Sequence, residues 1–184
     1  INWTAGTDIF TTNGLGVAYG EDGSGNDLWV ATGQGTNEIA TSPDGATWTA
    51  QTNPFTTQAR AVAWNGSLWV AVGSGGATIA TSPDGVTWTA RTSPFTTAVD
   101  SVAWNGSIWV AGGEDATTRI ATSTDGITWT ARTSPFTTGG FGLAWLPELS
   151  RWVAVGLGGA GIAYSDDNGT TWTAGFNDGD IYDS

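Results

Sequence analysis

The hydrophobic positions of this chain fall in short runs that turn residues interrupt. Within residues 61–90 each run has four or five residues and is rich in Ala, Val, Ile, Thr or Trp; the runs are Ala61–Trp64, Leu68–Val72, Thr78–Thr81 and Thr87–Ala90. Asn-Gly, a Gly-rich segment and Pro-Asp-Gly separate them, as is typical of strands joined by turns. The pattern predicts a meander of four antiparallel strands, and because no run has helical periodicity we expect essentially no α-helix.

The same segment recurs along the chain with a period of about forty residues. Its closing tryptophan returns as Trp48, Trp88, Trp129 and Trp172, at spacings of 40, 41 and 43 residues. A single four-stranded sheet cannot cover both of its apolar faces, so repeats of this length pack side by side as blades. The period predicts an all-β protein: a β-propeller of about four four-stranded antiparallel blades within one domain, residues 1–184. The repeats are expected at about 16–50, 61–90, 101–131 and 142–174.

Both ends of the chain add to this scheme. Residues 1–6 (INWTAG) resemble a closing strand, so the chain has one closing strand more than it has complete copies, and residues 175–184 follow the last copy as a tail. Our hypothesis is that residues 1–6 form an extra outer strand on an exposed sheet edge, where another subunit can add a strand. The alternatives are a fifth strand of one blade and the cut end of a longer array.

Linkers containing phenylalanine join the repeats. The four residues concerned are Phe10, Phe55, Phe95 and Phe136, and a proline precedes each of the last three. Proline stops the preceding strand because it fixes φ and has no N–H to donate. Aromatic side chains at repeated positions usually form core, so we expect these rings to pack between neighbouring sheets.

The charge of the chain limits its partners. It has five Arg, no Lys and a net charge of −12, and charged residues are only 12% of the total. An acidic surface repels phosphate backbones and anionic headgroups, so we expect neither nucleic-acid binding nor membrane insertion. No Cys is present, so disulfides and thiolate metal sites are excluded. Low charge with much Thr, Gly and Trp favours an extracellular or virion-surface location.

Each copy carries the same turn before its closing strand. The four segments are SPDGATW (42–48), SPDGVTW (82–88), STDGITW (123–129) and SDDNGTTW (165–172). The fourth has the full Ser-x-Asp-x-Gly-x-x-Trp pattern and resembles the Asp-box, or BNR-like, repeat; the first three are one residue shorter. The matching residues are Ser42, Asp44, Gly45, Trp48, Ser82, Asp84, Gly85, Trp88, Ser123, Asp125, Gly126, Trp129, Ser165, Asp167, Gly169 and Trp172.

The resemblance implies a propeller of the kind found in phage and bacterial surface proteins. It also implies that these residues are structural, in a hairpin turn between the third and outer strands of a blade, away from the functional face. Their chemistry agrees, because Asp can accept hydrogen bonds from the backbone of its own turn and Gly supplies a positive φ.

Ligand sites are expected where the copies differ. Eleven of the twelve Trp occupy repeated positions, which favours a role in the blade core over stacking on sugars. Loops on a rigid scaffold usually carry binding specificity. The candidate ligand residues in such variable segments are Glu21, Asp27, Glu38, Arg60, Asp100, Glu114, Arg119 and Arg151.

Two kinds of modification or ion site remain hypotheses. Asn2, Asn65, Asn105 and Asn168 each begin a sequence with the N-glycosylation pattern. Asn-Gly is equally the expected tight turn of a hairpin, and we favour that explanation for Asn65 and Asn105. The acidic loops 21–27 and 177–183 have the oxygen ligands that calcium prefers, but neither has a recognised calcium-loop spacing, so we predict no cofactor.

The inventory for catalysis is small. Without His or Cys the usual nucleophile–base pairs are missing. Asp-box propellers include sialidases with three converging arginines, and here Arg60, Arg119 and Arg151 fall in different parts of the repeat. We therefore predict a non-catalytic structural or interaction module that self-associates through sheet edges and contacts glycans or cell-surface and virion proteins. The alternatives are a lectin with repeated carbohydrate sites and a sialidase-like glycoside hydrolase.

Overall fold

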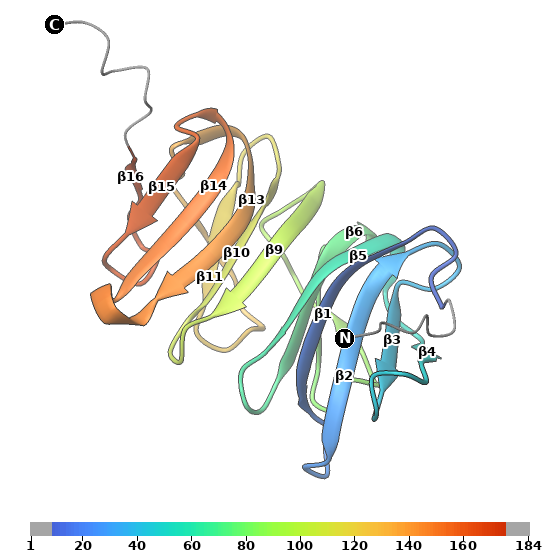
Figure 1. The fold of residues 1–184 in the computed structure, drawn as a ribbon. Helices are drawn as coiled ribbons and strands as arrows, with labels where there is room; N and C mark the ends of the chain where they lie inside the picture. Colours follow the sequence, from blue (N-terminus) through green and yellow to red (C-terminus); the bar gives the residue numbers. More distant parts are fainter. Residues whose placement is uncertain (1–8, 176–184) are drawn as a thin grey trace, which may run out of the picture. The chain divides into compact units, whose positions relative to one another are not determined.

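The computed structural model describes residues 9–175, which form antiparallel sheets and one short 3₁₀ turn (Figure 1). The predicted residues 1–6, Asn2 among them, and the tail 176–184 lie outside the described part of the chain. The chain divides into two compact units, Ile1–Arg91 and Thr92–Ser184, each with two of the predicted repeats. Each unit is described by itself below.

Every repeat is a meander of four strands. Copy 1 contains β1 (Asn13–Glu21), β2 (Asp27–Gln34), β3 (Ile39–Ser42) and β4 (Thr49–Gln51), and copy 2 contains β5 (Phe55–Trp64), β6 (Trp69–Gly76), β7 (Ile79–Ser82) and β8 (Thr89–Ala90). Copy 3 contains β9 (Ala98–Trp104), β10 (Trp109–Glu114), β11 (Ile120–Ser123) and β12 (Thr130–Arg132). Copy 4 contains β13 (Phe136–Leu146), the turn η1 (Pro147–Leu149), β14 (Arg151–Gly159), β15 (Ile162–Ser165) and β16 (Thr173–Ala174). Consecutive strands of each copy pair antiparallel, as predicted.

The core of the first unit lies between its two sheets. Side chains alternate between the faces of a strand, so Leu28 and Val30 of β2 meet Trp69 and Ala71 of β6 in one buried cluster. Phe55, from the linker between the copies, is 3% exposed in the same cluster. The linker phenylalanine therefore packs between neighbouring sheets, as predicted.

The second unit repeats this arrangement. Val110 of β10 and Ile120 of β11 pack against Trp152 and Ala154 of β14, and the linker residue Phe136 lies with them at 2% exposure. In both units a Val/Ile face of one copy therefore meets a Trp/Ala face of the next.

The tryptophans of the repeats have two environments. On the central strands Trp69, Trp109 and Trp152 are fully buried, which confirms the predicted core role for them. Each contacts an aromatic partner across its hairpin with ring centroids 4.9 to 5.3 Å apart; the partners are Trp64, Trp104 and Trp145. Trp129 is also buried, whereas Trp48, Trp88 and Trp172 are half-buried.

The first strand of a copy is longer than its apolar run predicts. β5 begins at Phe55 and takes in Thr56, Thr57, Gln58 and Arg60 besides the buried Ala59, with a register shift between Ala59 and Ala61. Similar shifts interrupt the pairing in the other copies. A bulge inserts an unpaired residue and breaks the alternation of apolar and polar side chains, so the sequence pattern did not predict this part of the strand.

Strand direction places the connections at two opposite ends of each sheet. Because consecutive strands are antiparallel, the connections β1–β2 and β3–β4 lie at one end, and the β2–β3 connection and the linker after β4 lie at the other. We call the first the turn end, since it carries the four Ser-x-Asp turns (42–48, 82–88, 123–129 and 165–172). We call the second the linker end, and in the copies considered below it is formed by residues 35–38 with 52–54 and by residues 115–119 with 133–135.

Candidate binding pockets at the linker end

The Ser-x-Asp turns hold themselves together. In the third turn the Ser123 hydroxyl donates to the Asp125 carboxylate at 2.9 Å, and the backbone N–H groups of Ile127 and Thr128 donate to that carboxylate at 2.8 and 2.7 Å. The N–H of Thr128, helped by those donors, lowers the pKa of Asp125 to about 2. Gly126 has φ +73°, where a side chain would be strained.

The longer fourth turn keeps the same contacts. Its extra residue, Asn168, takes the left-handed conformation at φ +58°, and Gly169 still donates its N–H to Ser165 at 2.9 Å. Thr171 supplies the main donors to Asp167 and lowers its pKa to about 2. These aspartates are therefore occupied by their own turns in both lengths of the motif.

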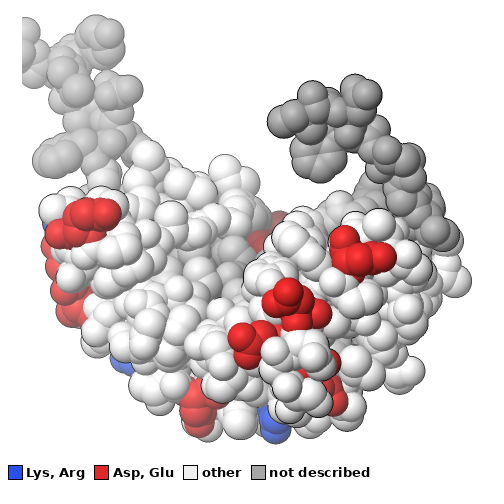
Figure 2. Space-filling model, turned by 60° about the horizontal axis from the view of Figure 1, so that its bottom comes forward, with Lys and Arg blue, Asp and Glu red and all other residues white. Residues whose placement is uncertain are grey.

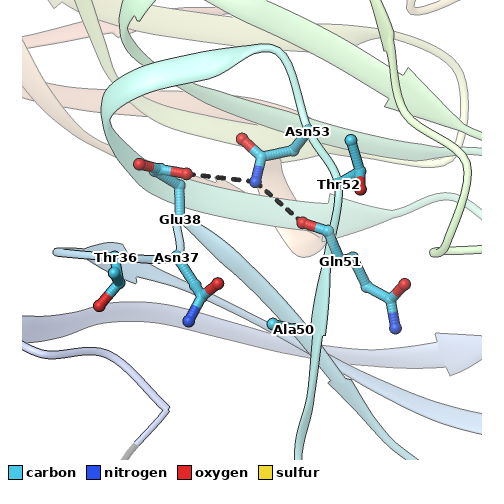
Figure 3. A pocket seen from close by; sticks show the side chains of 7 residues that line it. All are labelled: Thr36, Asn37, Glu38, Ala50, Gln51, Thr52 and Asn53. Atoms are coloured by element: carbon cyan, nitrogen blue, oxygen red, sulfur yellow. Dashed lines mark hydrogen bonds between the residues drawn. The ribbon is translucent and has the colours of Figure 1, made fainter.

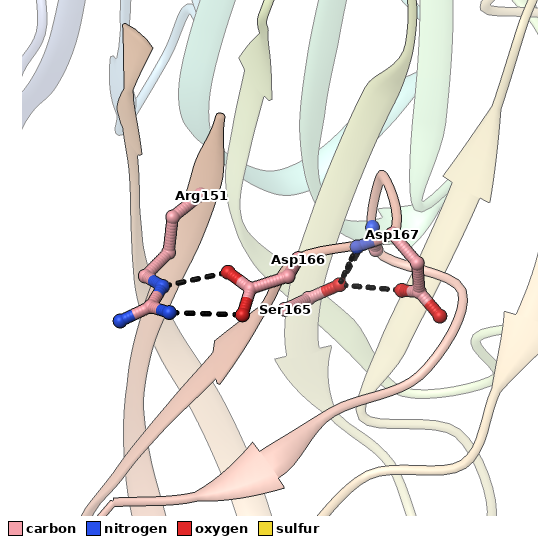
Figure 4. Close-up of polar contacts among 5 residues, drawn as sticks. Arg151, Ser165, Asp166 and Asp167 are labelled. Carbon is pink, nitrogen blue, oxygen red and sulfur yellow. Dashed lines mark hydrogen bonds and ion pairs between the residues drawn. The ribbon is translucent and has the colours of Figure 1, made fainter. Parts of the chain in front are cut away.

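Several sequence-predicted site residues also lie at the turn end and are used there locally. The hydroxyl of Tyr19 donates to Asp27, and Arg151 makes a two-bond ion pair with Asp166 at 2.6 and 2.8 Å (Figure 4). Asn65 and Asn105 each accept hydrogen bonds from the two residues that follow their glycine, as the tight-turn explanation requires. The glycosylation of Asn65, Asn105 and Asn168 stays a prediction.

The predicted ligand residues do not form one cluster. Glu21 ends β1 at the turn end, whereas Glu38, Glu114 and Arg119 lie at or next to the linker end. Arg60 and Asp100 lie within strands β5 and β9. Among residues 9–175, no group of three or more His, Cys, Asp or Glu could hold a metal ion, and the acidic loop 177–183 lies outside that range.

A pocket opens at the linker end of copy 1 (Figure 3). It holds about 280 Å³, and its lining residues come from the β2–β3 connection, β4 and the linker: Thr36, Asn37, Glu38, Ala50, Gln51, Thr52 and Asn53. The amide of Asn53 joins both sides, since it donates to Glu38 at 3.3 Å and to the carbonyl of Gln51 at 3.1 Å. Its oxygen accepts the N–H of Phe55 at 3.0 Å. Amides, hydroxyls and one carboxylate therefore converge on this pocket.

A second pocket lies at the linker end of copy 3. It holds about 370 Å³ and is lined by Thr117, Arg119, Ala131, Arg132, Thr133 and Ser134. The guanidinium of Arg132 donates through Nε to Thr122 at 2.8 Å, and Arg119 donates through Nη2 to the carbonyl of Thr137 at 2.6 Å. Two positive side chains are thus fixed at the pocket wall.

These two pockets occupy the same place in the repeat. Gln51 pairs with Ile39, and Arg132 pairs with Ile120, at the same register of the third and fourth strands. The side chains of both residues donate to the equivalent Thr41 and Thr122 at 2.8 Å. One frame therefore presents a carboxylate with amides in copy 1 and two guanidiniums in copy 3.

A buried aspartate shapes the second pocket. Asp115 is 5% exposed and accepts hydrogen bonds from Thr96, Thr117 and Thr118. Burial alone would raise the pKa of Asp115, but the donors, Thr96 first, outweigh it and hold that pKa well below its usual range. Its carboxylate is thereby committed to the connection that carries Arg119 and not to the pocket.

A third pocket adjoins the second. It holds about 340 Å³ and is lined by Thr133, Ser134 and Pro135 of the linker after copy 3 and by Thr170, Thr171 and Trp172 of the fourth Ser-x-Asp turn. Thr133 and Ser134 belong to both pockets. The indole N–H of Trp172 donates to the carbonyl of Gly169 at 3.0 Å, which fixes the ring beside Pro135.

The sequence pattern does not mark Gln51, Asn53 and Arg132 as pocket residues. Arg91 and Arg132 occupy the same position in successive copies and are therefore expected to lie apart, so the repeat alone marks neither as a binding residue. The variation at another repeat position could have revealed the pocket. Glu38, Thr78 and Arg119 occupy this position in copies 1 to 3, directly before the third strand. Only copy 3 has arginine both at this position and at the position of Arg132 in the fourth strand.

The surface charge is sparse. In Figure 2 the acidic residues form separate spots, basic residues are few, and most of this face carries neither. The described residues contain no helix long and apolar enough to cross a membrane.

Comparison with known proteins supports the fold. No family model and no curated protein sequence matches the chain. Among solved structures it is similar to YCF48 from Cyanidioschyzon merolae, with a TM-score of 0.61 and 14% identity over 90% of this chain and 57% of that one. It is also similar to the GH74 enzyme from Niastella koreensis, with a TM-score of 0.59 and 24% identity over 91% of this chain and 25% of that one. Both are β-propeller proteins, so the predicted fold class is confirmed, and the chain spans only part of the length of each.

Proposed function

We propose that the chain is a non-catalytic interaction module of an extracellular or virion surface that contacts glycans through its linker-end pockets. One observation carries this proposal: equivalent pockets in copies 1 and 3 are lined by residues that differ between the copies. A repeated frame with variable side chains at one place is how rigid scaffolds carry binding specificity. The Ser-x-Asp turns, each at the opposite end of its own copy, then serve as Asp-box turns that stabilise the blades.

The chemistry of the copy 1 pocket suits a sugar. Saccharide hydroxyls both donate and accept hydrogen bonds, and Thr36, Asn37, Glu38 and Gln51 offer hydroxyl, amide and carboxylate groups. The pocket is shallow and polar, which favours a glycan over an apolar ligand.

The same lining argues against a glycoside hydrolase that uses two carboxyl groups. Glycosidases typically act with two carboxyl groups on either side of the bond they cleave. Glu38 is the one carboxylate among the residues that line the copy 1 pocket, and Asn53 donates to it. The lectin alternative differs from our proposal only in requiring a similar site in every copy.

A glycan array tests this proposal. The wild-type chain should bind neutral oligosaccharides, and Glu38→Ala should weaken that binding because it removes a lining acceptor. Glu148→Ala, an equal change of charge on the exposed turn η1, is the matched control and should leave binding unchanged. Absence of binding across the array would contradict the glycan proposal, and turnover of fluorogenic glycosides would contradict the non-catalytic one.

Self-association is a second candidate property, and exposed apolar side chains favour it. Val155 and Ile162 of copy 4 are 44% and 50% exposed, whereas Val72 and Ile79 at the same repeat positions are fully buried. The outer strands β4, β8, β12 and β16 have only two or three residues each, so they offer little backbone for strand addition. We therefore propose that separate molecules of this protein associate through the face that carries Val155 and Ile162.

Light scattering across a range of concentrations tests the association. The wild type should form oligomers, and the double change Val155→Arg with Ile162→Arg should leave monomers. Ile127→Arg, on the exposed third Ser-x-Asp turn, is the control. A wild type that stays monomeric throughout would overturn this part of the proposal.

A further inference from the structure

The copy 3 pocket stands out by its charge. The whole chain has five Arg and no Lys against seventeen acidic residues, yet two of the five Arg line this pocket. Its other lining residues are Thr117, Ala131, Thr133 and Ser134, which carry no charge. An acidic protein has therefore placed two cations together around an open space of about 370 Å³.

Both guanidiniums are held in place without being neutralised. Their hydrogen-bond partners are the hydroxyl of Thr122 for Arg132 and the carbonyl of Thr137 for Arg119. No ion pair joins either arginine to a carboxylate within residues 9–175. In these hydrogen bonds Arg132 uses only its Nε and Arg119 only its Nη2, so other N–H donors of both guanidiniums remain for a ligand. The Nε of Arg119 is itself buried and has no partner within those residues. Fixing the side chains beforehand lowers the entropy that a ligand must overcome.

This arrangement matches an oxyanion. A guanidinium presents paired N–H donors in a planar fork that fits carboxylate or sulfate oxygens, and such charge-assisted hydrogen bonds are stronger than neutral ones. The hydroxyls of Thr133 and Ser134 add donors around the same space. The copy 1 pocket, with Glu38 in place of Arg119, would repel the same group.

The adjoining pocket indicates what carries the anion. Past the shared Thr133 and Ser134, the wall is formed by Pro135 and the half-buried ring of Trp172. An indole face packs against the apolar C–H face of a sugar ring, and Thr170 and Thr171 lie where ring hydroxyls could bind. An anionic group and an adjacent pyranose can thus be accommodated together.

Resting on the proposed glycan function, we propose that the Arg119–Arg132 pocket binds the carboxylate or sulfate group of an acidic saccharide, whose ring lies against Trp172. Copy 1 then selects neutral saccharides and copy 3 selects acidic ones. The two sites share a backbone frame and differ in the charge that they recognise.

The test uses small, matched probes and the whole chain. Methyl glucuronide, methyl glucoside 6-sulfate, methyl glucoside and inorganic sulfate are titrated into ¹⁵N-labelled protein, and the Nε–H signals of the arginines are followed. The two charged glycosides should shift the signals of Arg119 and Arg132, and methyl glucoside should not. The charged glycoside that binds more tightly identifies the anion. Inorganic sulfate should bind more weakly than either charged glycoside.

Arg91→Gln is the matched control for Arg132→Gln. Both arginines donate through Nε to the equivalent threonine, Thr81 or Thr122, at 2.7 and 2.8 Å, but Thr78 stands in copy 2 where copy 3 has Arg119. Arg119→Gln and Arg132→Gln should each weaken binding of the charged probe about tenfold, and Arg91→Gln should not change it.

The outcomes separate the two proposals. Binding of neutral glycans that depends on Glu38, with no response of Arg119 and Arg132 to either charged glycoside, would overturn this inference and leave the proposed function intact. Charged probes that bind equally well to Arg119→Gln and Arg132→Gln would also overturn it. Inorganic sulfate that binds as tightly as the charged glycosides would refute the saccharide part.

Discussion

The linker ends of copies 1 and 3 share a backbone and differ in charge. In both, the fourth strand pairs with an isoleucine of the third strand. In both, a linker side chain accepts the N–H of the phenylalanine two residues later: Asn53 accepts from Phe55, and Ser134 accepts from Phe136. Around this frame copy 1 places Glu38 and Gln51, and copy 3 places Arg119 and Arg132. Two positions per repeat therefore suffice to reverse the charge of a pocket while the blade stays the same.

The frame itself can be broken at the linker phenylalanine. Phe136→Ala removes a ring that is 2% exposed between β10 and β14, and Phe55→Ala does the same between β2 and β6. Each should lower the free energy of unfolding by about 3–5 kcal/mol, because the cavity cannot refill. Urea unfolding measures the loss, with Val86→Ala, on the exposed second Ser-x-Asp turn, as the control. A loss no larger than that of the control would show that the linker does not depend on its ring.

Exchanging the two side chains should exchange the selectivity. Glu38→Arg with Gln51→Arg builds the copy 3 set in copy 1, and the variant should gain a site for methyl glucuronide with about tenfold tighter binding than the wild-type pocket. Glu38→Gln is the control, because it removes the repulsive carboxylate without adding a guanidinium. The measurement is a titration followed on the N–H signals of the new arginines. If those signals do not respond, the shared frame is not sufficient for anion binding.

The turn ends should respond alike in both units, in contrast to the linker ends. The pKa of Asp125 is about 2 when folded, below the ordinary value of 3.8, so its contribution to stability is present above about pH 4 and is lost as the pH falls toward 2. Asp44 and Asp167 have the same folded pKa from the same kind of donors, the Thr47 N–H first for Asp44 and the Thr171 hydroxyl first for Asp167. Acid should therefore weaken copies of both units over one window.

Asp125→Ala tests how much one of these turns contributes to the free energy of unfolding. It should lower the free energy of unfolding at neutral pH by about 1 kcal/mol, a modest value because the exposed carboxylate competes with water. It should also reduce the further loss between about pH 4 and 2, which urea unfolding at several pH values would show. An unchanged pH profile would mean that other carboxylates set the acid sensitivity.

The sequence predicted the repeated blades and not the pockets, for a physical reason. Apolar runs, turn residues and repeated aromatics such as Phe136 depend on local geometry and on packing that recurs, so periodicity reveals them. Arg119 and Arg132 are thirteen residues apart, and only strand pairing and the return of the linker bring them to one pocket. Arg132 repeats the position of Arg91 in the preceding copy, and nothing in that repetition pairs it with Arg119. The extended start of β5 was hidden for a similar reason, since its bulge breaks the alternation.

Removing an exposed charge outside the pocket should have the smallest effect of these changes, on stability and on binding of the charged glycosides. Arg151 and Asp166 form a close two-bond pair, but their side chains are 35% and 52% exposed. Water competes for both groups and their ordering has an entropic cost, so Arg151→Gln should shift the melting temperature by less than about 2 °C. It should also leave binding of the charged glycosides unchanged, although it removes the same charge as Arg119→Gln. Weaker binding in Arg151→Gln would show that net charge, and not the placement of two guanidiniums, attracts the anion.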